Sequence, residues 1–151
     1  MTDPSARILL LNGPNLNTLG TREPEIYGHQ TLLDIVGAVE KRGLELGVEV
    51  AAFQSNHEGA LIDFLQKEAP EARGLILNFG SLTHTSIGLR DAVVATGLPA
   101  YEVHISNVFA REDFRHRSMI SDVCKGMVSG FGWRGYLYAL DALVAGLQEG
   151  C

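Results

Sequence analysis

Two side chains in one long loop suit proton abstraction. An apolar run at 8–11 ends in the turn formers NGPN at 12–15, and the next helical pattern starts at Thr31. A connection of this length between strand and helix is usually a lid or a binding loop, and this one carries Arg22 and Tyr27. A guanidinium held close to a phenol favours the phenolate, which is a base. The plainer interpretation is an exposed tyrosine that only packs.

A carboxylate and an imidazole recur two positions apart in a later segment. Glu102 and His104 alternate along a predicted strand at 99–105, so both side chains face the same side. A neighbouring carboxylate fixes the tautomer of an imidazole and favours its charged form, which makes the ring a proton donor. A satisfied, half-buried histidine is the competing structural interpretation.

Polar side chains also follow the other predicted strands. Asn78 and His84 leave the third strand, where they could bind hydroxyl groups or cap the following helix. Ser106 lies just past the fourth strand and could bind a carboxylate through its hydroxyl and nearby backbone N–H groups.

A basic segment follows in this acidic chain. Arg111 and Arg115 lie four positions apart and would share a face of a helical turn. The segment indicates an anionic small ligand or a subunit contact. Asp91 falls within a predicted helix, where a solvated position or a local pair with Arg90 is the plainer interpretation.

The elements that must position these groups alternate along the chain. Apolar runs predict strands at 8–11, 48–54, 73–78, 99–105 and 123–129. Helical spacing predicts helices from Thr31 to the stop at Gly47, from a capping box at 55–58 to Pro70, up to Gly97, and over 136–148.

Such alternation predicts an α/β fold, a flavodoxin-like doubly wound sandwich with a five-stranded parallel sheet. Residues 1–151 are expected to form a single catalytic domain with a lid loop at about 16–28. In sheets of this kind ligands bind beyond the carboxyl ends of the strands, which is where the polar side chains gather.

Two nucleotide or phosphate functions are disfavoured. The glycines of 130–135 spell GxGxxG, but they follow the last strand, and no later strand remains to carry the acidic ribose partner. A tight turn is the better interpretation. A phosphoacceptor receiver domain needs acidic residues after the first strand, where this chain has NGPN.

Composition narrows the class further. The formal charge of −6 argues against a nucleic-acid or anionic-membrane binder, and no segment is apolar enough to span a bilayer. The five histidines and two cysteines show no metal-binding spacing. Cys124 in an apolar run and Cys151 at the end are consistent with a reducing cytoplasm.

Four ordered motifs together resemble the type II 3-dehydroquinate dehydratases. They are LLNGPNLNTLGTREPEIYG ending at Gly28, QSNHEG at 54–59, LTHTSIGLRDA at 82–92 and EVHISNVFAREDFRHRS at 102–118. The resemblance runs from Ile8 to about Leu147. It implies reversible elimination of water from 3-dehydroquinate through an enolate, with no Schiff base, metal or other cofactor.

The resemblance also implies catalytic roles. Tyr27 would remove the proton next to the ketone, with Arg22 on the lid favouring its phenolate. Asn15 would help to hold a water that stabilises the enolate, and His104, oriented by Glu102, would protonate the departing hydroxyl.

Binding roles are implied as well. Ser106 and the backbone N–H of Ile105 would bind the carboxylate, and Arg111 would support the tyrosine. The ring hydroxyls would be bound by Asn78, His84 and Arg115. Asp91 would reach a neighbouring subunit's site in a dodecamer built from trimers. The alternative is a flavodoxin-like module that binds a small anion without converting it.

Overall fold

A parallel sheet of five strands organises the molecule. The computed structural model describes residues 6–21 and 23–150. The strands are β1 (Arg7–Asn12), β2 (Glu49–Gln54), β3 (Gly74–Asn78), β4 (Ala100–His104) and β5 (Gly126–Ser129). They lie in the order β2-β1-β3-β4-β5 and every neighbouring pair is parallel. This order confirms the predicted flavodoxin-like fold. The chain adds β2 on one side of β1 and β3 on the other, so the switch point of the sheet lies between β1 and β3.

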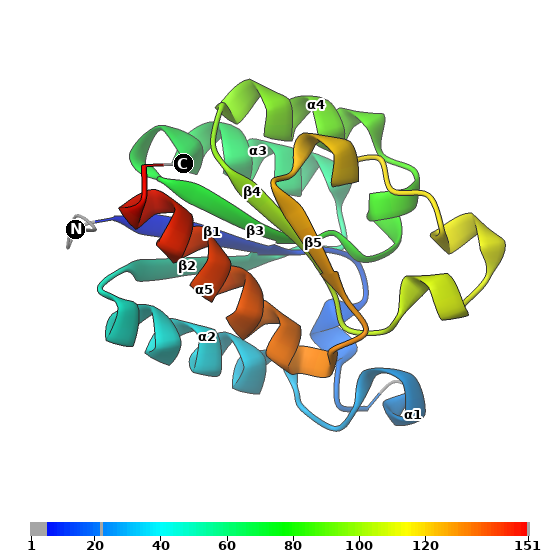
Figure 1. Ribbon diagram of the computed structural model, residues 1–151. Helices are drawn as coiled ribbons and strands as arrows, with labels where there is room; N and C mark the ends of the chain where they lie inside the picture. Colours follow the sequence, from blue (N-terminus) through cyan, green and yellow to red (C-terminus); the bar gives the residue numbers. More distant parts are fainter. Residues whose placement is uncertain (1–5, 22, 151) are drawn as a thin grey trace.

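Helices cover both faces of the sheet (Figure 1). The helices are α1 (Pro24–Tyr27), α2 (Leu32–Leu46), α3 (Glu58–Glu68), α4 (Ile87–Thr96) and α5 (Gly135–Gln148). Helices α2 and α5 pack together on one face, and α3 and α4 on the other. Across 6–21 and 23–150, no helix is both long and apolar enough to cross a membrane.

Burial on both faces explains the unbroken apolar run of β1. Ile8 and Leu10 belong to the core cluster beneath α2 and α5, whereas Leu9 and Leu11 belong to the cluster beneath α3 and α4. All four side chains are fully buried. Because successive residues of a strand face opposite sides, a strand with two covered faces needs apolar residues throughout.

The sequence predicted the start of helix α2 correctly, but the cap predicted for helix α3 is not formed. Helix α2 begins with the predicted capping box of Thr31 and Asp34 and ends before Gly47, which has φ of 81°. The capping box predicted at 55–58 is wrong. Helix α3 is capped by His57, and the Ser55 hydroxyl accepts a hydrogen bond from the nearer N–H of His57, at 3.0 Å. Short-range bonds of this kind compete with the helical pattern.

The last strand and its exit also differ in detail from the expectation. Residues 121–123 form a 3₁₀ turn, so β5 begins at Gly126 rather than near 123. The GxGxxG segment is a tight turn, as predicted, with positive φ at Gly130 and Gly132. A Cβ at Gly135 would approach Val128 Cγ1 to 3.1 Å, so the last glycine allows α5 to start close against the sheet.

Candidate active site

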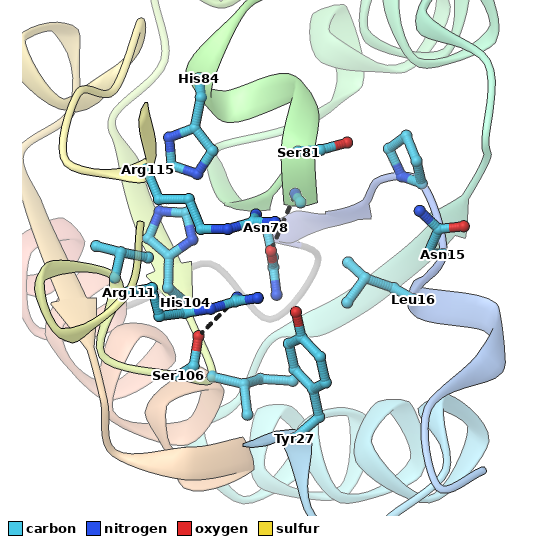
Figure 2. Close-up of a pocket in the computed structure, with 14 residues that line it drawn as sticks. Asn15, Leu16, Tyr27, Asn78, Ser81, His84, His104, Ser106, Arg111 and Arg115 are labelled. Atoms are coloured by element: carbon cyan, nitrogen blue, oxygen red, sulfur yellow. Dashed lines mark hydrogen bonds between the residues drawn. The ribbon is translucent and has the colours of Figure 1, made fainter. Parts of the chain in front are cut away.

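A cleft of about 150 Å³ opens at the carboxyl ends of β1, β3 and β4 (Figure 2). It brings together nine of the predicted site residues: Asn15, Tyr27, Asn78, His84, His104, Ile105, Ser106, Arg111 and Arg115. Pro14, Leu16, Gly80, Ser81 and Val108 complete its lining. The switch in strand order therefore lies beside the gathered polar side chains, as the fold rule predicts.

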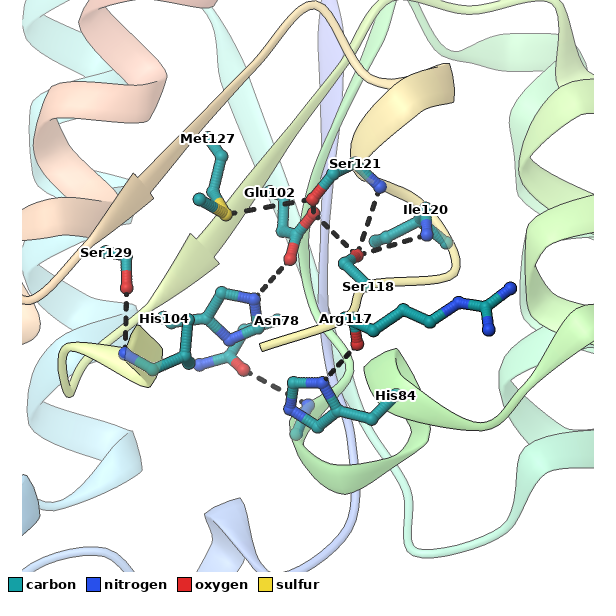
Figure 3. Close-up of polar contacts among 12 residues, drawn as sticks. Asn78, His84, Glu102, His104, Arg117, Ser118, Ile120, Ser121, Met127 and Ser129 are labelled. Carbon is teal, nitrogen blue, oxygen red and sulfur yellow. Dashed lines mark hydrogen bonds and ion pairs between the residues drawn. The ribbon is translucent and has the colours of Figure 1, made fainter. Parts of the chain in front are cut away.

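His104 and Glu102 form a buried pair at the end of β4 (Figure 3). His104 Nε2 and Glu102 Oε2 are hydrogen bonded, which confirms that both side chains face the same side of the strand. Burial would raise the pKa of Glu102, but the hydrogen bond and charge of His104, with two serine hydroxyls, hold that pKa below its ordinary value. The carboxylate is therefore ionised beside the imidazole.

The two serines were missed by sequence reasoning. Ser118 Oγ donates to Glu102 Oε1 at 3.0 Å, and Ser121 Oγ donates to the same oxygen. Ser118 Oγ in turn accepts from the backbone N–H groups of Ile120 and Ser121, at 3.1 and 3.0 Å. Nothing in the spacing of this segment signals the contact, because it arises when the chain folds back over β4.

The tautomer of His84 follows from its partner. His84 Nδ1 lies 2.8 Å from the carbonyl oxygen of Arg117, which can only accept, so Nδ1 carries the proton. Burial lowers the pKa of His84, and the nearby charges of His104 and Arg115 lower it further. Because Nδ1 carries the proton of the neutral ring, its Nε2 is a hydrogen-bond acceptor; the ring stacks on His104 with centroids 6.0 Å apart.

Arg111 lies over the ring of the loop tyrosine. Its guanidinium lies 5.3 Å from the centre of the Tyr27 ring, and its Nη1 donates to Ser106 Oγ at 3.2 Å. Arg22, the partner expected from the sequence, lies outside the described residues. The structure thus places one arginine between the tyrosine and the serine that were predicted to act in the same site.

Arg111 and Arg115 both reach the cleft, but they do not share one helical face. Arg111 follows the 3₁₀ turn Val108–Ala110, whereas Arg115 is the last residue of a second 3₁₀ turn, Asp113–Arg115. Arg115 Nε donates to Glu112 Oε1 at 3.2 Å. The expectation of a common helical face is therefore wrong, and tertiary folding of the segment brings both cations to the cleft.

Asn15 is held by a residue that sequence reasoning did not single out. Its backbone is left-handed, with φ of 70°, and its N–H donates to Asn56 Oδ1 at 2.9 Å. Gln54 Nε2 donates to the carbonyl oxygen of Gly13 at 3.1 Å, and to Asn56 Oδ1 at 3.2 Å. The carboxyl end of β2 therefore supports the start of the long loop.

Asp91 lies apart from the cleft on the exposed side of α4. Its exposed position agrees with the solvated interpretation, while the Arg90 guanidinium hydrogen bonds to Asp122 and the carbonyl oxygen of Met119. Within the described part of the chain, no three His, Cys, Asp or Glu side chains lie close enough to hold a metal ion.

Comparison with known proteins places this site in a family. The family profile described as Dehydroquinase class II matches residues 6–144. A 3-dehydroquinate dehydratase of Halothermothrix orenii is 53% identical over 144 residues, covering 95% of this chain and 97% of the relative. A 3-dehydroquinate dehydratase 1 of Corynebacterium efficiens is 58% identical over 139 residues, covering 92% of each.

A solved structure agrees with these relatives. The type II dehydroquinase of Butyrivibrio crossotus superimposes with a TM-score of 0.90 at 42% identity, covering 93% of this chain and 99% of that one. Sequence and fold are thus both shared over nearly the full length. The chain belongs to the class II dehydroquinase family.

Proposed function

We propose that this protein is a 3-dehydroquinate dehydratase, a hydro-lyase that interconverts 3-dehydroquinate and 3-dehydroshikimate. Family membership supports the activity, and the names of its relatives supply the substrate. The observation that carries the proposal is the placement of Tyr27 and His104 in one cleft, from separate elements. A β-elimination needs a base and an acid on one substrate, and these two groups can take those roles.

The reaction would proceed through an enolate. The Tyr27 phenolate removes the proton from the carbon next to the ketone, the C–H electron pair forms the C=C bond of the enolate, and the carbonyl π pair moves to the oxygen. A water held with the help of Asn15 stabilises that oxygen. The enolate then re-forms the ketone as the C–O bond breaks, and His104 protonates the departing hydroxyl to give water and the enone. Glu102 orients His104, and Arg22 would favour the Tyr27 phenolate.

The remaining lining residues would fix the substrate. Ser106 and the Ile105 N–H bind its carboxylate, and its ring hydroxyls are bound by Asn78, His84 and Arg115. Arg111 supports Tyr27, which its position above the ring favours. We also expect the trimer-based dodecamer implied by the family resemblance, in which Asp91 reaches a neighbouring site, and a cytoplasmic location.

Neither a metal nor a redox cofactor is required by this sequence of steps. An imine route would need a lysine, and the chain has Lys41, Lys67 and Lys125, none of which lines the cleft. Borohydride added with the substrate should therefore leave the activity intact. Covalent capture of the substrate on a lysine would refute the enolate route.

The direct test is to mix the protein with 3-dehydroquinate and follow the absorbance of the conjugated enone. Steady growth of that absorbance at catalytic protein concentration is the expected result. A non-catalytic module that binds a small anion would instead show saturable binding by calorimetry without enone formation. That outcome would replace the proposal with the binding alternative.

A further inference from the structure

A buried phenol lies behind the cleft and joins two strand ends. Tyr136 lies in the first turn of α5, and its hydroxyl oxygen is 2.7 Å from Asn78 Nδ2 and 2.6 Å from Asn12 Oδ1. Asn12 and Asn78 are register partners at the carboxyl ends of β1 and β3. All three side chains are buried, and Asn78 also lines the cleft.

One backbone group sets the direction of this hydrogen-bond chain. The N–H of Gly80 donates to Asn78 Oδ1 at 3.2 Å, and a backbone N–H can only donate. The amide oxygen of Asn78 must therefore face Gly80, so its nitrogen faces Tyr136. The phenol oxygen then accepts from Asn78, and the phenol proton is donated to Asn12 Oδ1.

The direction decides what Asn78 can offer to a ligand. An amide nitrogen carries two protons, and one of them is used by Tyr136. Its oxygen already accepts from the Gly80 N–H, so the second N–H is the donor that remains for the cleft. Burial raises the pKa of Tyr136, which keeps the phenol protonated near neutral pH and so preserves its hydrogen bonds to Asn78 and Asn12.

The polar residues of this hydrogen-bonded chain do more than stabilise the fold. Asn12 Nδ2 is buried without a hydrogen-bond partner among the described residues, which is unfavourable. Apolar side chains of similar shape at these positions would avoid that cost. A buried polar chain with one unsatisfied group is more readily explained if one of its members must be oriented for binding.

We propose that Tyr136 is a positioning residue that fixes the Asn78 amide so that it presents a single N–H donor to the cleft. A ligand atom that binds this N–H is a hydrogen-bond acceptor, such as a hydroxyl oxygen that donates its own proton elsewhere. The identity of the ligand rests on the proposed function. The orientation of Asn78 rests on the contacts alone.

A double-mutant cycle tests whether Tyr136 acts through Asn78. Tyr136→Phe keeps the ring and removes the hydroxyl, and we expect kcat/KM for 3-dehydroquinate to fall about tenfold, chiefly through KM. In an Asn78→Ala background the same change should alter kcat/KM by less than about twofold, because the group it orients is gone. Equal losses in both backgrounds would overturn the proposal, since a purely structural role would appear in both.

Tyr138→Phe is the matched control. Tyr138 lies on the same helix, is 48% exposed and packs edge-on against Phe131. Its change should leave kcat/KM and the melting temperature near the wild-type values. A loss equal to that of Tyr136→Phe would show that kinetics respond to any tyrosine hydroxyl of α5, and would contradict a specific role.

A measurement without substrate separates this proposal from the proposed function. In wild-type protein labelled with ¹⁵N, one proton of the Asn78 side-chain amide should exchange slowly with solvent and its partner quickly. Two equally fast protons would refute the orientation without any variant. Absence of enone formation by wild-type protein would instead refute the activity, while slow exchange of the single proton would still support the positioning role.

Discussion

The two sides of the cleft are built differently. On the strand side, His104 is bound to Glu102, and Asn78 is bound to Tyr136, by contacts between buried side chains. On the loop side, the backbone bonds around α1 are local, such as Tyr27 N–H to the Glu23 carbonyl at 3.1 Å. The Tyr27 ring is half-buried and packs at the edge of the core.

This difference separates two requirements of the proposed reaction. The proposed acid His104 and the proposed binding residue Asn78 end two buried strands, and we expect such strands to open only with the whole fold. The proposed base is carried on a segment whose backbone hydrogen bonds around α1 are local, so we expect it to rearrange more easily than the sheet. We therefore expect substitutions on the two sides to affect activity and stability in different proportions.

The largest expected effect is on the loop side. Tyr27→Phe should lower kcat about 10³-fold, because a positioned general base contributes roughly 10²–10⁴-fold. The melting temperature should change little, since the substitution keeps the ring that packs at the edge of the core. Enone absorbance and thermal unfolding measure the two quantities. Turnover near the wild-type rate would exclude Tyr27 as the base, and a large fall in melting temperature would contradict the contrast between the two sides.

On the strand side, Glu102→Gln should reduce both the turnover and the stability of the protein. Removing the negative charge beside His104 should lower kcat about 10²-fold, because the imidazole loses the carboxylate that accepts its hydrogen bond and orients the ring. It should also reduce the free energy of unfolding by about 1–3 kcal/mol, since a charge-assisted buried hydrogen bond is lost. Urea unfolding measures the second effect. Loss of activity with unchanged stability would place Glu102 in the same class as Tyr27.

Removing the two serines that bind Glu102 should change how the free energy of unfolding depends on pH. Because its pKa is lowered in the folded state, Glu102 stabilises the fold above its unfolded value of about 4.3, and this contribution is lost as pH falls through the folded value. Ser118→Ala with Ser121→Ala should raise the folded pKa and reduce unfolding free energy by about 2 kcal/mol at pH 7. Urea titrations between pH 3 and about 7 are the measurement.

Ser129→Ala is the control for that pair. The Ser129 hydroxyl accepts from the N–H of Val108 and donates to the Ser106 carbonyl oxygen, both at 3.2 Å, and so binds no carboxylate. Its removal should lower stability equally at every pH. A loss from the paired substitution that is just as independent of pH would show that the serines do not act through the charge on Glu102.

The smallest expected effect lies where the loop rejoins the fold. Thr31→Ala removes the hydroxyl that accepts the Asp34 N–H at 3.1 Å and caps α2. It should cost about 1 kcal/mol, or a few degrees in melting temperature, with kcat within about twofold of wild type. A clear loss of turnover would show that the loop depends on this helix start, and that the two sides are less independent than their contacts indicate.

Predictions from the sequence were most successful for features that depend on residues close together along the chain. The alternation of buried runs and helical spacing predicted the five-stranded sheet because periodicity is a property of neighbouring residues. The same period placed Glu102 and His104 on one face of β4. The strand-end rule then indicated that Asn15, Asn78 and His104 would share a cleft, which they do.

They were less successful where a contact joins distant segments. Asn15 and Asn56 are 41 positions apart, and Asn78 and Tyr136 are 58 apart. No spacing in the chain relates them, because their meeting depends on strand order and on how closely α5 packs against the sheet. The local signal at 55–58 was misleading, since helix α3 is capped by His57 and the Ser55 hydroxyl accepts from the His57 N–H instead of forming a capping box.

The sequence by itself determined the fold class, the cleft's place in the sheet and most of the polar groups around it, because each follows from local periodicity and turn chemistry. The tertiary structure alone decided how those groups are oriented: the serines beneath Glu102, the tautomer of His84, and the Asn78 amide held by Tyr136. Orientation depends on partners brought together by packing, and packing is a property of the whole chain.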